Sequence, residues 1–268
     1  MKFFIQFNQV IYTNFIISYM SIEKVIFSKL SCDKSSAIVR ASAISSITLL
    51  LEAPSTHAVL GTMLPSFKFM IHDKSEKVRL AMVNMLLKIK KIPGIKYYHV
   101  VPVEHLLARL AVEATGNLNP CGPVPSSLTN LMQNSYFPQG EGISGSEQVR
   151  RTLSFLSSYP ESACVFYKNL PSHLSINSIC KLIAMLFKCL IAAVETETKG
   201  SQDISTNGGC GSRKRRSKES NSLNVTKSRI DNQNGKGRPG CTLIASNTTL
   251  MVSITETICS LWETVGLL

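Results

Sequence analysis

The segment Gly140-Glu-Gly-Ile-Ser-Gly145 has the spacing G-x-G-x-x-G, which in dinucleotide sites lets the backbone approach a pyrophosphate at the start of a helix. Such a site needs a buried strand before the first glycine and a parallel sheet to hold the loop. Tyr136-Phe-Pro-Gln139 precedes it instead, and the sequence shows no strand alternation. We interpret the segment as a flexible loop. Nucleotide binding that disappears on Gly142→Asp would instead indicate an enzyme.

Other residues that could carry catalysis or bind a metal lack the spacing that either role requires. The five histidines, His57, His72, His99, His105 and His173, form no H-E-x-x-H or mixed Cys/His metal pattern. Glu104-His105 begins an amphipathic segment and is interpreted as a solvated pair. No serine lies in a nucleophile-elbow motif. We therefore expect a non-enzymatic protein with no catalytic residue, metal or cofactor.

The eight cysteines lie far apart and include no C-x-x-C pair. Cys180 and Cys189 fall inside an apolar helical pattern, which is typical of reduced, buried thiols in an intracellular protein.

The N-terminal segment 1–20 is apolar, but polar residues interrupt each apolar run and no small-residue cleavage site follows. A secretory signal is therefore disfavoured against a scaffold helix or an artefactual start. We expect no membrane span, which would need roughly 20 apolar residues in succession.

Basic charge is concentrated in one polar segment. The chain has a formal net charge of +12, and residues 199–240 contain ten Lys or Arg against three acidic residues. Because this segment has almost no large apolar side chains, we expect a disordered basic linker. Its run Arg213, Lys214, Arg215, Arg216 and Lys218 suits nuclear import, with direct DNA contact and solvated linker charge as alternatives.

The rest of the chain shows helical periodicity. Apolar residues recur every three or four positions, which predicts helices at about 38–51, 57–71, 73–91, 102–110, 126–135, 147–158, 161–169, 174–194 and 251–265. Pro65 should kink the second of these or shorten it. Asp73 and Glu76 have the spacing of a capping box at the start of the third. In the segment 174–194, a broad buried face is expected from Ile176, Ile179, Cys180, Ile183, Leu186, Phe187, Leu190 and Val194.

An internal repeat decides between a bundle and an extended array. Asp33-Lys-Ser-Ser-Ala-Ile-Val-Arg40 is echoed by Asp73-Lys-Ser-Glu-Lys-Val-Arg79. The Val-Arg pair thus recurs after roughly 40 residues, a period that is typical of the helix pairs in HEAT and armadillo arrays. The fold class expected is therefore all-α, a HEAT/armadillo-like α-solenoid. The HEAT-motif positions are Asp33, Val39, Arg40, Leu64, Pro65, Asp73, Val78 and Arg79.

The block from His72 to Leu110 resembles the G-type HEAT subunit of condensin II, and weaker similarity extends it to roughly 21–195. The resemblance implies that Asp73 and Arg79 tie one repeat to the next. It also implies a non-catalytic subunit that docks on a kleisin and SMC subunits, contacts DNA or chromatin, and works in the nucleus during mitotic chromosome condensation. The chain is far shorter than the members of that family.

We predict four regions from these patterns: an unmatched apolar segment (1–20), HEAT-like repeats (21–198), the basic linker (199–240) and a C-terminal amphipathic helix (241–268). Basic side chains cluster around one repeat, where they could contact DNA or an acidic partner: Lys74, Lys77, Lys88, Lys90, Lys91 and Lys96. No membrane or small-molecule partner is expected. The alternatives are another HEAT adaptor, such as a transport or phosphatase scaffold, and a non-assembling fragment.

Overall fold

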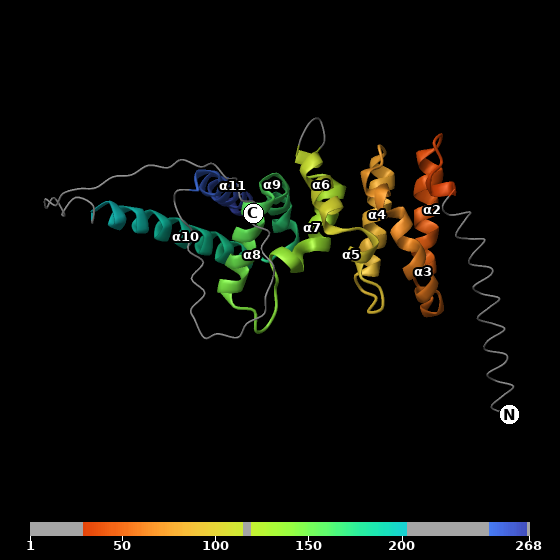
Figure 1. Cartoon of the computed structure of the whole chain (residues 1–268), viewed down its shortest axis with the longest axis horizontal. Coiled ribbons are helices and arrows are strands. Elements are labelled where there is room, and N and C mark those ends of the chain that lie inside the picture. Colours follow the sequence, from red (N-terminus) through yellow and green to blue (C-terminus); the bar gives the residue numbers. More distant parts are fainter. Residues whose placement is uncertain (1–28, 115–118, 203–246, 267–268) are drawn as a thin grey trace, which may run out of the picture.

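The computed structural model describes residues 29–114, 119–202 and 247–266, and within these ranges the protein is helical without a strand (Figure 1). The predicted all-α solenoid class is confirmed. The N-terminal segment 1–20 and the basic run at 213–218 lie outside the described residues.

The first half of the chain consists of short helices joined by tight turns. They are α2 (Ala37–Leu50), η1 (Pro54–Thr56), α3 (His57–Met63), η2 (Leu64–His72), α4 (Glu76–Ile89), α5 (Tyr97–Val100), α6 (Val103–Ala114) and α7 (Pro123–Tyr136). Most lie where the apolar periodicity predicted them. The one-turn helix α5 was not predicted, because a single turn is too short to show a period.

The second half ends in two longer helices. Its elements are α8 (Gly145–Ser158), α9 (Pro160–Asn169), η3 (Leu170–His173), α10 (Ile176–Gln202) and α11 (Thr248–Gly266). Helix α10 continues past residue 198, where the helical repeats were predicted to end. Helix α11 packs on α8, α9 and α10, so the C-terminal amphipathic segment docks back onto the array.

Pro65 shortens the α-helix predicted at 57–71, which was one of its two expected effects. It is the second residue of η2, where the α-helix α3 gives way to a 3₁₀-helix. Proline has no amide hydrogen and its ring clashes with the preceding turn, so the α-helical ladder cannot continue through it.

The capping box predicted for α4 does not form. Ser75 is the N-cap and makes no side-chain cap, and the Asp73 carboxylate accepts the Ser75 amide hydrogen at 2.8 Å. Both oxygens of Asp73 are also held by Arg40. The prediction failed because local spacing does not reveal a partner that lies in another repeat.

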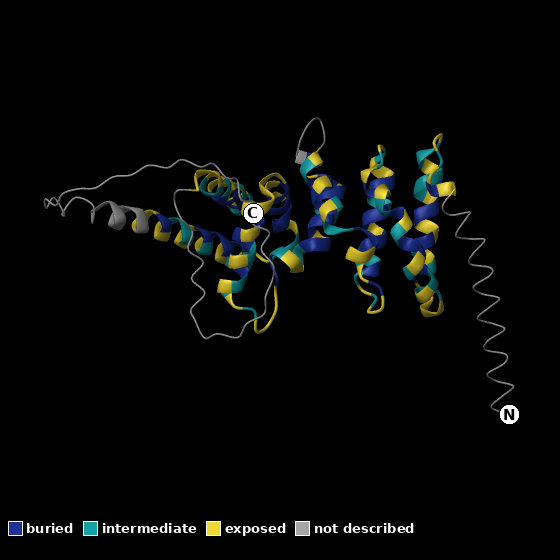
Figure 2. Ribbon diagram, in the orientation of Figure 1, coloured by how far each residue is buried: buried dark blue, intermediate teal, exposed yellow. Residues whose placement is uncertain are grey.

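The helices form two packed rows along the long axis of the molecule (Figure 1). In one row α2 contacts α4, and α4 contacts α7. In the other, η2 contacts α6, and α6 contacts α9. The α4–η2, α6–α7 and α7–α9 contacts join the rows. Buried residues occupy the parts of each helix that face its neighbours, and exposed residues occupy the outer parts (Figure 2), so each pair of helices covers the next.

Helix α10 is only partly covered. Ile179, Ile183 and Leu186 are buried as predicted, whereas Phe187 and Val194 are about half exposed. The prediction of one broad buried face was therefore wrong for its outer positions. Neighbouring helices cover only one side of α10, and the apolar pattern extends beyond that side.

The described cysteines are free thiols, but Cys180 is exposed and Cys189 half-buried, contrary to the prediction of buried positions. Helix α10 contains one segment with the composition of a membrane span, although no such span was expected from the sequence. Its segment Ile176–Glu195 has the length and mean hydropathy (1.8) of a spanning helix, with 28% of that window buried in the protein. The bent pair of Ala37–Leu50 and Pro54–His72 meets the same test only as one broken span. A core helix passes it as well.

The buried face of α4, which packs on α2, η2 and α7, should be a major source of stability. We expect Leu86→Ala to lower the free energy of unfolding by about 3 kcal/mol, because Leu86 is fully buried and truncation leaves a cavity. Leu49→Ala is the matched control: Leu49 is 65% exposed and should change stability by less than about 0.5 kcal/mol. Urea unfolding followed by circular dichroism measures both. Equal losses would contradict the packing described for these helices.

Candidate interaction surface

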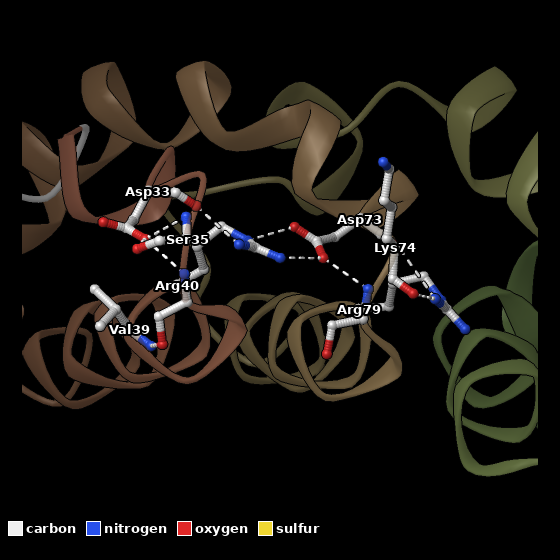
Figure 3. A network of polar contacts seen from close by, with 9 residues as sticks. Asp33, Ser35, Val39, Arg40, Asp73, Lys74 and Arg79 are labelled. Carbon is white, nitrogen blue, oxygen red and sulfur yellow. Dashed lines mark hydrogen bonds and ion pairs between the residues drawn. The ribbon is translucent and has the colours of Figure 1, made fainter.

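Arg40 joins the first repeat to the second, because its side chain contacts both the turn before α2 and the turn before α4 (Figure 3). Its Nε donates to Asp73 Oδ2 at 2.7 Å and its Nη2 to Asp73 Oδ1 at 2.9 Å, a bidentate ion pair. Its Nη1 donates to the Asp33 carbonyl oxygen at 2.8 Å. The two side chains of the pair are only 13% and 8% exposed. A planar guanidinium suits this contact, because its donors match a carboxylate.

The two aspartates hold equivalent turns. Asp33 Oδ1 accepts the amide hydrogens of Ser35 and Ser36 at 2.9 and 2.7 Å, and Asp73 Oδ1 accepts that of Ser75. These hydrogen bonds lower the pKa of Asp33. Burial tends to raise the pKa of Asp73, but hydrogen bonds from Arg40 and Ser75 outweigh it and hold that pKa below its usual value. Each aspartate thus fixes its turn in the ionised form.

Arg79 repeats this arrangement one step along the array. Its Nη1 donates to the carbonyl oxygens of Asp73 at 2.9 Å and Lys74 at 3.1 Å, as Arg40 does to Asp33. Its Nε lies 3.4 Å from Glu113 Oε1, an ion pair without a hydrogen bond. We call the contacts Arg40–Asp73 and Arg79–Glu113 the inter-repeat ladder. Of the remaining HEAT-motif positions, Leu64 in η2 and Val78 in α4 are buried. Val39 in α2 and Pro65 in η2 are half-buried.

Glu113 was not predicted, although the sequence contains a signal for it. The acidic residues Asp33, Asp73 and Glu113 follow one another at equal intervals along the chain. Because Glu113 lies inside α6 and not in a turn, it does not share the local motif of the two aspartates. Only the packing of α6 shows that Glu113 faces Arg79 as Asp73 faces Arg40.

A buried excess of positive charge surrounds Glu113. Arg109 also contacts it, with Nε donating to Oε1 at 2.9 Å, so one carboxylate faces two guanidinium groups. All three residues are at most 6% exposed. Burial lowers the pKa of Arg109, and Glu113 opposes that effect. The Glu113 carboxylate therefore partly compensates the positive charge of the two buried arginines.

The predicted basic residues do not form one groove. Lys74 and Lys77 lie at the start of α4, and Lys88, Lys90 and Lys91 at its end. Lys77 and Lys88 are both in the helix, so about 16 Å of helix axis separates them. The prediction of a single cluster around this repeat therefore resolves into two separate groups.

Two of these lysines, Lys88 and Lys90, contact groups outside α4. Lys88 Nζ lies 2.6 Å from Glu52 Oε1, beyond the end of α2, and Lys90 Nζ donates to the Asn130 carbonyl oxygen in α7 at 2.9 Å. Burial lowers the pKa of Lys90. Lys91 and Lys96 are exposed and line a pocket beside Tyr97 and Tyr98.

His72 and His105 meet where η2 packs on α6, a contact that the sequence did not indicate. The Nε2 atom of His72 lies 3.2 Å from Nδ1 of His105, and Phe69 packs edge-on against His105 with ring centroids 5.4 Å apart. His105 is half-buried, which corrects its interpretation as a solvated partner of Glu104. Burial lowers the pKa of His72, and the positive charges of His105 and Arg109 lower it further.

The other sequence candidates for chemistry are not gathered into a site. The glycine-rich segment joins α7 to α8, with Gly140 and Gly142 at positive φ and Ser144 capping α8. It follows a helix in place of the strand that a dinucleotide site needs. Among the described residues, no group of three or more His, Cys, Asp or Glu could hold a metal ion.

Aromatic residues from three separate segments form one cluster. Tyr136 stacks on Phe155 with ring centroids 3.8 Å apart. Phe166 packs edge-on against both of these rings, and Tyr167 packs edge-on against Phe166. Burial raises the pKa of Tyr136 to about 12. Residues from α7, α8 and α9 therefore meet in the same core.

Removing the shared carboxylate should strongly destabilise the array. We expect Glu113→Gln to lower the free energy of unfolding by about 3 kcal/mol, because Arg79 and Arg109 would stay buried without a counter-ion. Glu147→Gln is the matched control, since Glu147 pairs with Arg150 and Arg151 near the surface of α8, where such pairs contribute little. Urea unfolding curves compare the two. A Glu113→Gln midpoint equal to that of the control would refute a role for this contact.

Asp73 should make the protein sensitive to acid. A carboxyl whose pKa is lowered by folding stabilises the folded state above its unfolded pKa, and this contribution is lost as the pH falls through the folded pKa. Stability should therefore drop below about pH 4. Asp73→Asn should be less stable at neutral pH and lose less on acidification. Thermal unfolding between neutral and acidic pH tests this, with Glu141→Gln, an exposed loop residue, as control.

Comparison with known proteins identifies similar chains. No protein-family model matches the sequence, and no solved structure matches it. The chain is 37% identical over 171 residues to the condensin-2 complex subunit G2 of Xenopus laevis, which covers 63% of this chain. The identity is 33% over 174 residues for the Homo sapiens protein of that name and 34% over 176 residues for that of Danio rerio. These alignments cover 64% and 65% of this chain.

These relatives are much longer than the chain. It spans 14% of the length of each of the three. The resemblance to the G-type subunit of condensin II that residues 72–110 predicted is confirmed. Over nearly two thirds of its length, this chain is similar to one segment of the condensin-2 complex subunit G2 proteins.

Proposed function

We propose that this chain is a non-catalytic HEAT-repeat scaffold of a condensin II-like complex. It would bind the kleisin and SMC subunits, contact DNA or chromatin, and act in the nucleus in mitotic chromosome condensation. The observation that carries the proposal is the 37% identity to a condensin-2 subunit over 171 residues. That similarity covers 63% of the chain.

The geometry supports a scaffold role. A solenoid exposes a long surface relative to its size, and its shape depends on how rigidly each repeat is held on the next. The ladder holds α2, α4 and α6 on one edge, while the Lys88–Glu52 and Lys90–Asn130 contacts hold the other edge of α4. An array fixed at both edges would present a partner with a preformed surface, so less order would have to be gained on binding.

The basic run at 213–218 supports a nuclear location. It combines four cationic residues in succession with a fifth two positions later, which suits an import receptor or nucleic-acid phosphates. The same basic run could therefore be recognised by an import receptor or could contact nucleic-acid phosphates, and these are separate roles. Location and assembly therefore require separate measurements.

We expect the tagged full chain, purified from mitotic cells, to recover kleisin and SMC subunits of condensin II, as identified by mass spectrometry. A chain with Arg213, Lys214, Arg215, Arg216 and Lys218 changed to serine should still recover them, because the nuclear envelope no longer separates them in mitosis. In interphase, a fluorescent fusion of that variant should remain outside the nucleus. Glu113→Lys is the control for the fold: it reverses the buried charge and should abolish recovery.

Soluble, expressed chain that recovers neither kleisin nor SMC subunits would contradict the proposal. Recovery of transport or phosphatase components instead would identify another class of HEAT adaptor. Nuclear entry of the serine variant at the normal rate would remove the import role from the basic run.

A further inference from the structure

The turn after α4 forms a pocket lined by basic, aromatic and apolar side chains. It has a volume of about 350 Å³, and its walls include Lys90, Lys91, Pro93, Lys96, Tyr97 and Tyr98. All come from one continuous stretch that runs from the end of α4 into α5. A pocket of this size holds a single nucleotide or a side chain, and is too small to hold a folded partner.

The pocket carries positive charge with no acidic residue among its walls. The sequence has no Asp or Glu between Glu76 and Glu104. Lys88 is paired with Glu52 and so adds little net charge, but Lys90 contacts only a carbonyl oxygen, which does not neutralise it. Lys91 and Lys96 are exposed beside it. Three cations around one hollow without a carboxylate favour an anionic ligand.

Tyr98 adds a flat apolar surface at the rim of the pocket. Its side chain is 44% exposed, although its ring is held edge-on by Tyr97, with centroids 5.4 Å apart, and by His99 at 4.8 Å. Tyr97 is in turn placed by its hydroxyl, which lies 3.4 Å from Ser135 Oγ in α7. The exposed ring is therefore oriented before a ligand arrives, as a stacking platform requires.

A ligand that contacts both the lysines and the Tyr98 ring must combine negative charge with an accessible flat ring. Duplex DNA keeps its base faces stacked inside the helix, where Tyr98 could not reach them. A duplex would also need cations along the length of its phosphate backbone. Lys74 and Lys77 are at the opposite end of α4 and cannot extend this site. An acidic peptide would use the lysines and leave the tyrosine ring unused. Single-stranded nucleic acid offers phosphates and open base faces together.

We propose that the pocket after α4 binds single-stranded nucleic acid, with one base stacked on Tyr98 and the adjoining phosphates against Lys91 and Lys96. This inference rests on the proposed contact with DNA and names the form of nucleic acid that the described part of the chain would take. It does not depend on kleisin or SMC binding.

The test is fluorescence anisotropy on the purified full chain in which the five basic residues of 213–218 are changed to serine. That background removes sequence-independent binding by the run. The probes are labelled oligothymidylate and the same strand annealed to oligoadenylate, at low salt because phosphate contacts weaken as salt rises. We expect tighter binding of the single strand, and Tyr98→Ala to weaken it about tenfold, the loss expected for one stacked base.

Matched variants separate the site from general charge and from loss of fold. Tyr159→Ala removes a ring of nearly equal exposure, 43%, from a pocket lined by Glu104 and Glu161, and should leave binding unchanged. Lys91→Ala with Lys96→Ala should weaken binding and flatten its salt dependence, whereas Lys74→Ala with Lys77→Ala should not. Circular dichroism confirms that each variant is folded.

A second measurement locates the contact. Oligonucleotides that carry 5-iododeoxyuridine should crosslink to Tyr98 on irradiation, and mass spectrometry identifies the modified peptide. Equal affinity for single strand and duplex, or equal effects of Tyr98→Ala and Tyr159→Ala, would overturn the proposal. Displacement by oligoglutamate as effectively as by unlabelled oligothymidylate would overturn it in favour of an acidic peptide. Recovery of kleisin and SMC subunits is unaffected by any of these results, so the failure of one proposal is distinguishable from that of the other.

Discussion

The contact between an arginine of one repeat and an acidic residue of the next is the constraint on which this array depends. Arg40 and Arg79 each donate to a carbonyl oxygen in their own turn and reach a carboxylate of the following repeat. Apolar burial alone would let one helix pair slide over the next, because it has no direction. A charge-assisted, largely buried contact fixes the register, since a shifted arrangement would leave a guanidinium unpaired in the interior.

Helix α4 carries basic side chains that contact other parts of the protein and basic side chains that are exposed to solvent. At the start of α4, Arg79 is buried within the ladder. At its end, Lys88 and Lys90 contact groups of the neighbouring helices, and only Lys91 and the nearby Lys96 are exposed. A count of basic residues in this region therefore overstates the charge that a partner would meet. Lys74 and Lys77 are exposed at the start of the helix, whereas Lys91 and Lys96 are exposed beside a tyrosine ring. This combination of charge and ring distinguishes the pocket from an ordinary solvated surface.

The terminal helices differ from the ladder region. Helix α11 covers part of α10, α9 and α8, yet Phe187 and Trp262 stay about half or more exposed around a shared hollow. Solenoid repeats bury their faces on neighbours, so a terminal pair is covered on one side only. This explains why the apolar pattern of α10 is broader than its buried side and why the helix meets the composition of a membrane span.

The helical class, most helix positions, the break at Pro65 and the recurrence of an Asp-to-Arg motif could all be predicted from the amino-acid order. These features depend on local periodicity, on proline's missing amide hydrogen and on comparison of short segments, each of which can be read along the chain. The order did not show which acidic residue each arginine contacts, that Asp73 serves Arg40 instead of capping α4, or that His72 meets His105. It also did not show that the six predicted lysines divide between two ends of a helix, or that Cys180 is exposed. All of these depend on which helix packs against which face, and partners in different repeats leave no local pattern in the sequence.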